Sequence, residues 1–500
     1  MSAPAASAGR RGVKLVCTLG PATSTIESVR ALAEAATNVF RVNLSHGDAD
    51  ARRHLVELVR GVSEERGEDH AVMMDLPGPK IRLGELRGGE ARLEVGARFE
   101  LRSDGAEGDG AGASTTYTGL AADVRPGDRI LLSDGAVELT VVSTEGSAVV
   151  SEVVRAGRIR SGAGVNVPAE RLSLPGITDR DRAGLHEVMD VGADLLAQSF
   201  VRSASDVIGL RALMAERAIP IVAKIETRPA VDDIAAILGH ADAVMVARGD
   251  LGVELPMEEI PILQKEMLVA ARAASKPAIV ATQMLESMVH APRPTRAEAS
   301  DVANAVLDGA DAIMLSGETA IGEFPIEAAR AAVTIAEVAE RRGARFLAPE
   351  PACAHTDEAA AVAHAAAGIA GSDGAVEAIA CYTGTGRTAR LLSAERPGVP
   401  IYAFAPEPIV ERRLAPLWGV VPLLARRPSD TDEMIALMDV GLREHRLVPD
   451  GATVVLAASS PAGIGHTNML KVHRVGGAVR QAASAAASPS ASANRSATTR

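Results

Sequence analysis

Three charged side chains stand at the ends of two neighbouring apolar runs in this sequence. Lys224 and Glu226 close the run PIVAKI, two residues apart and so on one face of an extended strand, and Asp250 follows the next run, AVMVAR. Two carboxylates suit Mg2+, which leaves its other positions to water and substrate phosphate. A lysine ammonium beside such an ion is what a migrating phosphoryl group requires, because charge develops on its oxygens in transit. The pattern favours metal-assisted phosphoryl transfer.

Other apolar runs also end in polar residues. In a barrel of parallel strands these ends meet on one face, which carries the active site. Any single member of this set is as readily a helix cap or a rim ion pair, but the whole set is improbable as coincidence. One member, Arg41, is a candidate to anchor a phosphate together with a carboxylate. The set comprises Arg41, Asn43, Ser45, His46, Asp75, Arg248, Gly249, Thr282, Ser316 and Glu318.

The runs that carry these residues are short and nearly continuously hydrophobic, as strands buried on both faces must be. Helix-sized stretches separate most of them, such as the one that a Thr295-x-x-Glu298 capping box opens and Gly309 closes. Eight such β/α units predict an α/β fold, a (β/α)8 TIM barrel. The eight runs are residues 13–19, 38–44, 71–76, 194–200, 220–225, 243–248, 277–282 and 312–317.

Two further segments depart from the barrel rhythm. Residues 77–170 are Gly-rich and alternate in polarity, which predicts a small β domain inserted after the third barrel strand, where it can act as a lid. Residues 355–477 predict a C-terminal α/β domain with a mainly parallel sheet, whose strands are expected at 378–383, 400–406, 420–425, 453–459 and 469–475. The barrel then occupies 13–76 and 171–345. Disordered tails are expected at 1–12 and 478–500, the latter being Ala/Ser-rich.

Composition excludes several functional classes. The 500 residues carry a net charge of −12, so affinity for a phosphate backbone is not expected. They include only six Phe, three Tyr and one Trp, so base stacking is not expected either. The composition therefore predicts no nucleic acid partner. No run approaches the roughly 18 apolar residues of a membrane span. The N-terminus lacks the apolar segment of a signal peptide, and the three cysteines are scattered, so we expect a cytoplasmic protein. Neither zinc-ligand spacings nor a P-loop motif occurs.

A loop in the C-terminal domain resembles a phosphate cradle. Small residues follow a predicted strand and open a helix, which leaves backbone N–H groups free for an anion. The same letters spell a weak dinucleotide fingerprint, and a merely tight turn is a third interpretation. The loop consists of Thr383, Gly384, Thr385, Gly386, Arg387 and Thr388.

Several stretches of the chain are together similar to the pyruvate kinase family. They run in the family's order from residue 13 to about 475, and include VKLVCTLGPAT, NVFRVNLSHG, DLPGPKIR, IVAKIET, VMVARGDLGVELP, ATQMLESM and PRPTRAEASDVANAVLDGADAIMLSGETAIGEFP. The resemblance implies a barrel with an inserted lid and a C-terminal effector domain. It implies an enzyme of glycolysis that transfers a phosphoryl group from phosphoenolpyruvate to ADP, giving pyruvate and ATP.

The resemblance also implies roles for individual residues. Arg41 is expected to contact the phosphate of phosphoenolpyruvate, Lys224 to stabilise the transferring group, and Glu226 and Asp250 to hold Mg2+ or Mn2+. The nucleotide side is expected to be lined by Asn43, Leu44, Ser45, His46 and Arg82.

Three further positions are implied at the other end of the substrate. Gly249 and Thr282, with Asp250, are expected to contact its carboxylate, and Thr282 and Ser316 are candidates for the proton path to the enolpyruvate methylene. A phosphorylated small-molecule effector at the loop 383–388 and a homotetramer follow from the resemblance alone.

The chain departs from many family members near its third barrel strand. Where they carry Thr-Lys-Gly-Pro-Glu, this chain has Leu76-Pro77-Gly78-Pro79-Lys80. In those members K+ sits among oxygens equivalent to Asn43, Ser45, Asp75 and a Thr hydroxyl. Leu76 offers no side-chain oxygen, and Lys80, one of six lysines beside 46 arginines, brings a positive charge where the family has a negative one. We predict that the enzyme needs no K+, with Lys80 as the cation substitute.

A second departure concerns the lid. The family's lid often presents a lysine before its GVNLP segment, and here only Arg160 is near. Two other functional classes remain open at this point: a non-catalytic paralogue that binds sugar phosphates or nucleotide, and another metal-dependent barrel that acts on phosphoenolpyruvate, such as an aldolase or carboxylase. The joint presence of Lys224, Glu226, Asp250 and Thr282 argues against the first. The inserted lid and Arg82 argue against the second.

Overall fold

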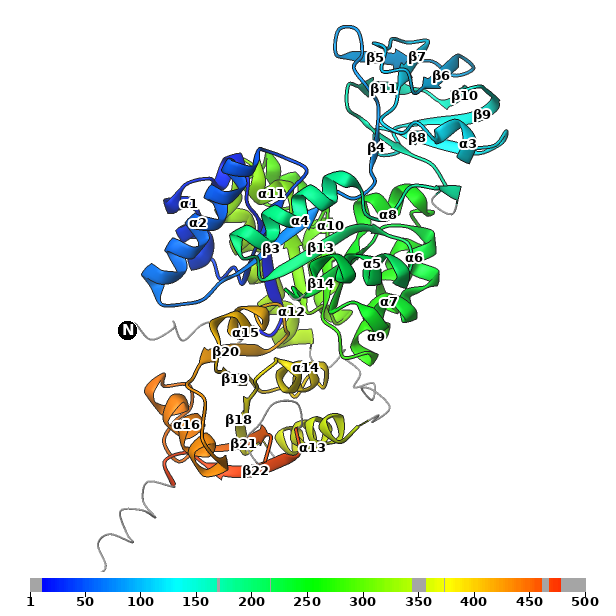
Figure 1. Ribbon diagram of the computed structural model, residues 1–500. Coiled ribbons are helices and arrows are strands. Elements are labelled where there is room, and N and C mark those ends of the chain that lie inside the picture. The colour runs from blue at the N-terminus through cyan, green and yellow to red at the C-terminus, as the bar shows by residue number, and fades with distance from the viewer. Residues whose placement is uncertain are drawn as a thin grey trace, which may run out of the picture. The chain divides into compact units, whose positions relative to one another are not determined.

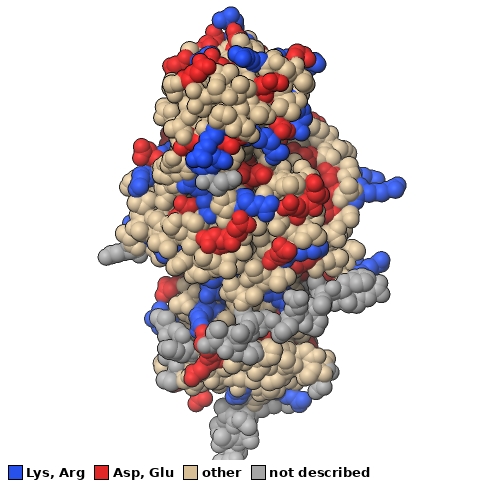
Figure 2. Space-filling view, turned by 90° about the vertical axis from the view of Figure 1, so that its right-hand side faces the viewer, with Lys and Arg blue, Asp and Glu red and all other residues tan. Residues whose placement is uncertain are grey.

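The computed structural model describes residues 11–168, 171–215, 217–343, 357–372, 374–460 and 467–477. The chain forms two compact units, of which one comprises residues 10–354 with 412–418 and the other comprises the rest (Figure 1). No helix among the described residues is long and apolar enough to cross a membrane. On the face drawn in Figure 2, acidic and basic side chains are interspersed among the other residues.

The larger unit contains a closed barrel of eight parallel strands in the order β1-β17-β16-β15-β14-β13-β3-β2. All eight expected runs are strands, so the predicted TIM barrel is confirmed. Its interior is filled by small aliphatic and methionine side chains such as Val16, Met73, Ala197 and Met245. The strands are β1 (Lys14–Thr18), β2 (Val39–Asn43), β3 (Ala71–Leu76), β13 (Leu195–Val201), β14 (Ile221–Ile225), β15 (Ala243–Ala247), β16 (Ala278–Ala281) and β17 (Ala312–Leu315).

Helices cover the outside of the barrel, and local sequence signals set their ends. The expected capping box of Thr295 and Glu298 opens α10, and Gly67 and Gly192 end α2 and α4 in the left-handed conformation that favours glycine. The main helices are α1 (Ile26–Glu34), α2 (Ala49–Arg66), α4 (Asp179–Val191), α5 (Ala204–Met214), α7 (Ile234–His240), α9 (Ile260–Ala273), α10 (Arg296–Leu307) and α12 (Pro325–Gly343). Short helices follow several strands: η1 (Pro21–Thr23), α6 (Arg228–Asp232), α8 (Arg248–Glu254), η3 (Glu286–Val289) and α11 (Gly317–Ala320).

The segment after β3 forms the predicted β insertion. Its sheet has the order β4-β12-β8-β9-β10-β6-β7 and is antiparallel except between β6 and β7, and β5 pairs with β11 separately. Phe99 and aliphatic side chains fill its own core. The elements are β4 (Ile81–Arg82), β5 (Glu90–Leu93), β6 (Arg98–Arg102), β7 (Gly112–Ser114), α3 (Leu120–Asp123), β8 (Arg129–Leu132), β9 (Val137–Glu145), β10 (Ala148–Arg155), β11 (Gly157–Arg160) and β12 (Gly164–Asn166).

The smaller unit contains a five-stranded sheet in the order β20-β19-β18-β21-β22. Strands β20, β19, β18 and β21 are parallel, and β22 is antiparallel to β21. The sheet is therefore mainly parallel, as predicted. The elements are α13 (Glu358–Ser372), β18 (Val376–Tyr382), α14 (Arg387–Ala394), β19 (Ile401–Ala405), α15 (Pro408–Arg413), β20 (Val420–Leu424), α16 (Thr431–Glu444), β21 (Thr453–Ala458) and β22 (Met469–Arg474).

Two boundaries differ from expectation. The N-terminal tail was expected to reach residue 12, but Arg11 is buried and donates hydrogen bonds to the Ala36 carbonyl and to Asn38 Oδ1. Residues 412–418, expected in the C-terminal domain, belong to the barrel unit, where Ala415 joins the barrel interior. Gly12 lies so close to the Trp418 indole that an added Cβ would clash with it. The tails at 1–10 and 478–500 lie outside the described residues.

Candidate active site

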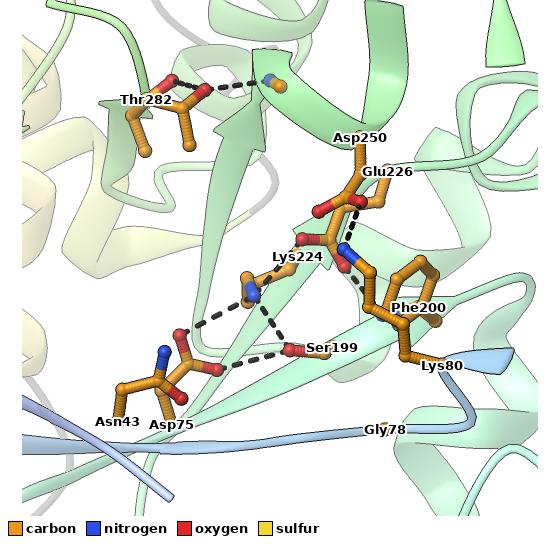
Figure 3. Close-up of polar contacts among 12 residues, drawn as sticks. Asn43, Asp75, Gly78, Lys80, Ser199, Phe200, Lys224, Glu226, Asp250 and Thr282 are labelled. Atoms are coloured by element: carbon orange, nitrogen blue, oxygen red, sulfur yellow. Dashed lines mark hydrogen bonds and ion pairs between the residues drawn. The ribbon is translucent and has the colours of Figure 1, made fainter. Parts of the chain in front are cut away.

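The ammonium of Lys224 is the centre of a buried polar cluster at the carboxyl ends of β3, β13 and β14 (Figure 3). Lys224 Nζ lies 2.6 Å from Ser199 Oγ, 3.0 Å from Glu226 Oε1 and 3.4 Å from Asp75 Oδ2. Glu226 and Asp75 are each 1% exposed. Burial alone would lower the pKa of Lys224, but the two carboxylates outweigh it and raise the pKa above its usual value. The amine is therefore held in its charged form.

Glu226 and Asp250 come from adjacent strands, since β14 and β15 pair in parallel with Ile225 opposite Val246. Burial raises the pKa of Glu226, Lys224 opposes this, and the nearby Asp250 carboxylate adds to it. The backbone N–H of Phe200 donates to Glu226 Oε2 at 2.7 Å. Asp250 lies in the first turn of α8, and its Oδ1 accepts from Lys80 Nζ at 2.8 Å.

These two carboxylates fit a hard divalent cation. They present oxygen atoms from neighbouring strand ends, and their present partners are two lysine ammoniums, so the site already attracts positive charge. Among the residues that the structure describes, no group of three or more His, Cys, Asp or Glu is arranged to hold a metal. A pair of carboxylates suits Mg2+, which needs only one or two from the protein.

Arg41 lies beside this cluster on β2. Its Nε and Nη2 contact Asp75 Oδ2 at 2.8 and 2.7 Å, and its Nη1 donates to Thr18 Oγ1 at 3.0 Å. Burial would raise the pKa of Asp75, but Lys224 and Arg41 outweigh it and hold the pKa below its ordinary range. Asp75 is thus the anion that brings Arg41 and Lys224 together.

Thr282 and Gly249 form a second small constellation at the ends of β16 and β15. The Thr282 hydroxyl donates to the Ala281 carbonyl at 2.6 Å and accepts from the Gly249 N–H at 2.7 Å. The Thr282 backbone is left-handed, with φ of 70°, and its carbonyl accepts from Arg248 Nη2 at 2.8 Å. Arg248 Nη1 also donates to Asp301 Oδ1 at 2.7 Å, and this contact holds the Arg248 side chain in place. The Thr282 hydroxyl is therefore fixed in place, and it both donates and accepts a hydrogen bond.

Ser316 stands apart from these groups. It precedes α11, and its backbone N–H donates to Glu318 Oε2 at 2.7 Å, while Glu318 Oε1 accepts from the Leu285 N–H. None of the hydrogen bonds and ion pairs recorded among the described residues joins Ser316 to Lys224 or Thr282.

The expected nucleotide residues follow β2. Asn43 Oδ1 accepts from the Ser45 N–H at 3.0 Å, and the Ser45 carbonyl accepts from Arg180 at 3.2 Å. Leu44 has a buried side chain, so only its backbone faces the site. Burial lowers the pKa of His46, and the charges of Arg82, Arg41 and Arg180 add to this. Three arginine charges therefore act on this loop, which makes it a region for an anion.

The expected potassium positions need one correction. Asn43 and Asp75 are opposite each other in the β2–β3 register. Leu76, however, points away from the site into the core between strands and helices, where it is 2% exposed. Side chains alternate along a strand, so a residue at 76 cannot face the same side as Asp75. The missing hydroxyl at Leu76 is therefore no reason for potassium independence, and that prediction depends on Lys80 alone.

The expected effector loop lies in the smaller unit. Thr383 Oγ1 accepts from the Gly386 N–H at 3.0 Å, and Gly386, with φ of 86°, precedes α14. Thr388 is buried, and its hydroxyl pairs with that of Thr467 at 2.6 Å. Arg387 forms an ion pair with Asp357. Three of the loop's polar side chains, Thr383, Arg387 and Thr388, thus already have partners, as in a tight turn. The sequence also suggests residues 463–466 as a second wall of this pocket, but they lie outside the described residues.

Sequence reasoning missed two residues of the Lys224 cluster, Ser199 and Phe200. Both stand at the end of the fourth barrel strand, and the rule that selected polar residues at strand ends would have selected Ser199 had it been applied there. Arg180 was missed as well. It follows the insertion at the start of α4, far along the chain from the loop that it contacts.

Comparison with known proteins gives consistent matches. The family model for the pyruvate kinase barrel domain matches residues 10–329, and that for the pyruvate kinase alpha/beta domain matches residues 360–473. A pyruvate kinase of Mycobacterium tuberculosis is 42% identical over 470 residues, covering 93% of this chain and 99% of that protein. One from Bacillus licheniformis is 40% identical, covering 94% and 81%. A crystal structure of a pyruvate kinase from Cryptosporidium parvum has a TM-score of 0.85 and 32% identity, covering 95% of this chain and 98% of that one.

Proposed function

The chain belongs to the pyruvate kinase family, and on that premise we propose that the cluster around Lys224 transfers the phosphoryl group of phosphoenolpyruvate to ADP. Family membership makes the chain a phosphotransferase that yields pyruvate and ATP. The observation that carries the residue assignment is the charged ammonium held among Ser199, Glu226 and Asp75 at the carboxyl face of the barrel.

In the proposed mechanism the chain contributes positive charge that is fixed before the substrate arrives. Lys224 faces the oxygens of the phosphoryl group in transit, and Arg41 binds the phosphate of phosphoenolpyruvate. A Mg2+ ion held by Glu226 and Asp250 would supply further positive charge to the phosphate oxygens. Such preorganised charge lowers the barrier because it needs no reorganisation when the oxygens become more negative.

The carboxylate end of the substrate is assigned to the turn of Gly249 and Thr282, beside Asp250. Transfer leaves the enolate of pyruvate, which must gain a proton at its methylene carbon. Thr282 is the better candidate for that path than Ser316, since its hydroxyl lies at the turn that would bind the substrate. Its proton now points to the Ala281 carbonyl, so the hydroxyl must rotate before it donates.

The nucleotide is assigned to the loop after β2. Asn43, Leu44, Ser45 and His46 present backbone and small polar groups there, and Arg82 on β4 supplies charge from the base of the insertion. The lowered pKa of His46 supports this placement, because it reports the combined burial and positive potential at this point.

We assign Lys80 the role that K+ has in other members of the family. Its ammonium lies 2.8 Å from Asp250 Oδ1 and 5.8 Å from the centre of the Phe200 ring, so a monovalent positive charge is already present beside the metal site. The enzyme then requires a divalent cation, Mg2+ or Mn2+, and no K+.

Regulation and assembly remain proposals from the family. The loop 383–388 is assigned to a phosphorylated small-molecule effector, with Arg387 as its charged group, and the chain is assigned to a homotetramer in the cytoplasm.

Burial raises the pKa of Cys17 and of Cys381 to about 12, which suits thiols that stay reduced and inert.

One assay separates the enzymatic alternatives. Pyruvate formation from phosphoenolpyruvate is measured with Mg2+, with and without ADP. Pyruvate that appears only with ADP supports the proposal. Consumption of phosphoenolpyruvate without ADP, when bicarbonate or an aldose phosphate is supplied as the second substrate, would indicate a carboxylase or aldolase. No consumption under any of these conditions would indicate a non-catalytic paralogue.

A further inference from the structure

Strand β13 breaks its regular pairing where it reaches the site. Gln198 is opposite Ala223 on β14, but Val201 is opposite Ile225, so Ser199 and Phe200 together face the single residue Lys224. This is a β-bulge, a feature that re-aims side chains next to active sites. Phe200 has φ of 54°, a left-handed conformation that is costly for a bulky residue and is retained where the surroundings determine it.

Ser199 occupies a position whose hydrogen-bond directions follow from chemistry. It is 3% exposed, and its Oγ lies 2.6 Å from Lys224 Nζ and 3.1 Å from Asp75 Oδ1. An ammonium only donates and a carboxylate only accepts, so the hydroxyl must accept from Lys224 and give its own proton to Asp75. The direction Lys224 to Ser199 to Asp75 is therefore fixed (Figure 3).

Ser199 differs from the other partners of Lys224 because it is neutral. The Glu226 and Asp75 carboxylates hold the ammonium in place but also offset its charge. The hydroxyl makes the shortest of the three contacts and leaves the charge intact. A site that must present positive charge to phosphoryl oxygens gains more from such an anchor than from a third carboxylate.

The rest of the bulge fixes the neighbouring groups. The Phe200 N–H holds Glu226 Oε2, which turns Oε1 toward Lys224, and the Phe200 ring lies against Lys80. Gly78 packs on the bulge so tightly that a Cβ there would lie 2.9 Å from the Ser199 carbonyl oxygen and 3.0 Å from its Cβ. The backbone at Gly78 therefore packs directly against Ser199 and leaves little room for the bulge to shift toward it.

We propose that the bulge of Ser199 and Phe200 is a positioning element of the phosphoryl-transfer site, in which Ser199 holds the Lys224 ammonium at its working place without reducing its charge. The inference rests on the proposed function, and Ser199 acts through Lys224 rather than on the substrate. Misplacement of a catalytic group by about 1 Å can lower the rate roughly 100-fold.

The test compares Ser199→Ala, Ser199→Thr and wild type. Ser199→Ala should lower kcat by roughly 10- to 100-fold while the KM for phosphoenolpyruvate and the Mg2+ dependence stay nearly unchanged. Ser199→Thr keeps the hydroxyl and should recover most of the lost turnover. The matched control is Ser151→Ala, which removes a fully buried hydroxyl that has no recorded partner and lies on β10 of the insertion. It should leave kcat unchanged.

A second measurement does not depend on turnover. Lysines are labelled with trinitrobenzenesulfonate, and the rate at Lys224 is determined by peptide mass spectrometry relative to the half-exposed Lys265. Losing its shortest contact should make Lys224 react several-fold faster in Ser199→Ala. An unchanged labelling rate, or a variant that keeps more than half of wild-type kcat, overturns the proposal. A wild type that forms no pyruvate refutes the proposed function instead, and the labelling still decides whether Ser199 holds Lys224.

Discussion

Replacing Lys224 by methionine removes one positive charge from between two buried carboxylates. Each of its contacts, at 3.0 Å to Glu226 and 3.4 Å to Asp75, represents about 5 kcal/mol of Coulomb attraction at an effective dielectric of 20, before desolvation is counted. Measured losses on breaking a buried pair are about 3–5 kcal/mol, because the remaining charge is left uncompensated. We therefore expect Lys224→Met to lower the free energy of unfolding by about that amount at neutral pH.

The loss should depend on pH with a defined sign. The pKa of Glu226 is already raised by burial and loses the opposing effect of Lys224, whereas Arg41 still contacts Asp75, so the folded variant binds more protons at Glu226 than the unfolded one. Its stability then falls as pH rises and recovers as pH falls. The difference in thermal midpoint between variant and wild type should shrink between pH 8 and pH 5.

The variant should lose most of its turnover even at temperatures where it stays folded. The loss of one preorganised charge costs about 10²–10³-fold in turnover. Pyruvate formation is measured below the variant's unfolding temperature, with Lys265→Met as the control, since Lys265 is a half-exposed lysine whose partner is Asp308 on the outside of the barrel. A Lys224→Met variant that keeps more than a tenth of wild-type turnover would refute the role assigned to Lys224.

Four further outcomes are expected. Glu226→Gln and Asp250→Asn should each require far more Mg2+, because each removes a charged oxygen from a hard cation, and unchanged Mg2+ titrations in both would place the metal elsewhere. Wild-type activity should be equal in sodium, tetramethylammonium and potassium buffers of matched ionic strength, and Lys80→Glu should lower it; several-fold activation of the wild type by K+ contradicts this. Burial lowers the pKa of His70 to about 4, so the folded state should lose roughly 3 kcal/mol as pH falls from about 6.5 to about 4, and His70→Gln should flatten that profile. Fructose bisphosphate, glucose 6-phosphate, ribose 5-phosphate or AMP should shift the apparent substrate affinity, by a coupling of about 1–3 kcal/mol, and Arg387→Glu should abolish the shift; no shift with any of the four leaves the loop 383–388 as a tight turn.

The barrel and the contacts at its centre were predictable because each depends on a local rule. A strand buried on both faces must be apolar, and parallel strands bring their carboxyl ends together, so Lys224, Glu226 and Asp250 could be placed side by side. The Thr295 capping box likewise needs only four residues of sequence.

The features that sequence did not reveal depend on tertiary packing. The error at Leu76 came from counting oxygens without asking which face of the strand each residue takes. The bulge at Ser199 is an irregularity in pairing between two strands, and neither strand alone carries a signal for it. The same holds for Thr388, whose hydroxyl is occupied by Thr467, 79 residues away.

The segment 412–418 determines when the contacts of the barrel unit can be completed during synthesis. Asp194, fully buried before β13, pairs with Arg60 at 2.7 Å and with Arg412 at 2.7 Å, and Trp418 Nε1 donates to Glu340 at 2.9 Å. When α12 has been synthesised, Arg60 is already present, but Arg412 and Trp418 are not. Both contacts are complete only after more than seventy further residues, so a fragment cut after α12 would leave Asp194 paired with Arg60 alone and Glu340 without the Trp418 indole.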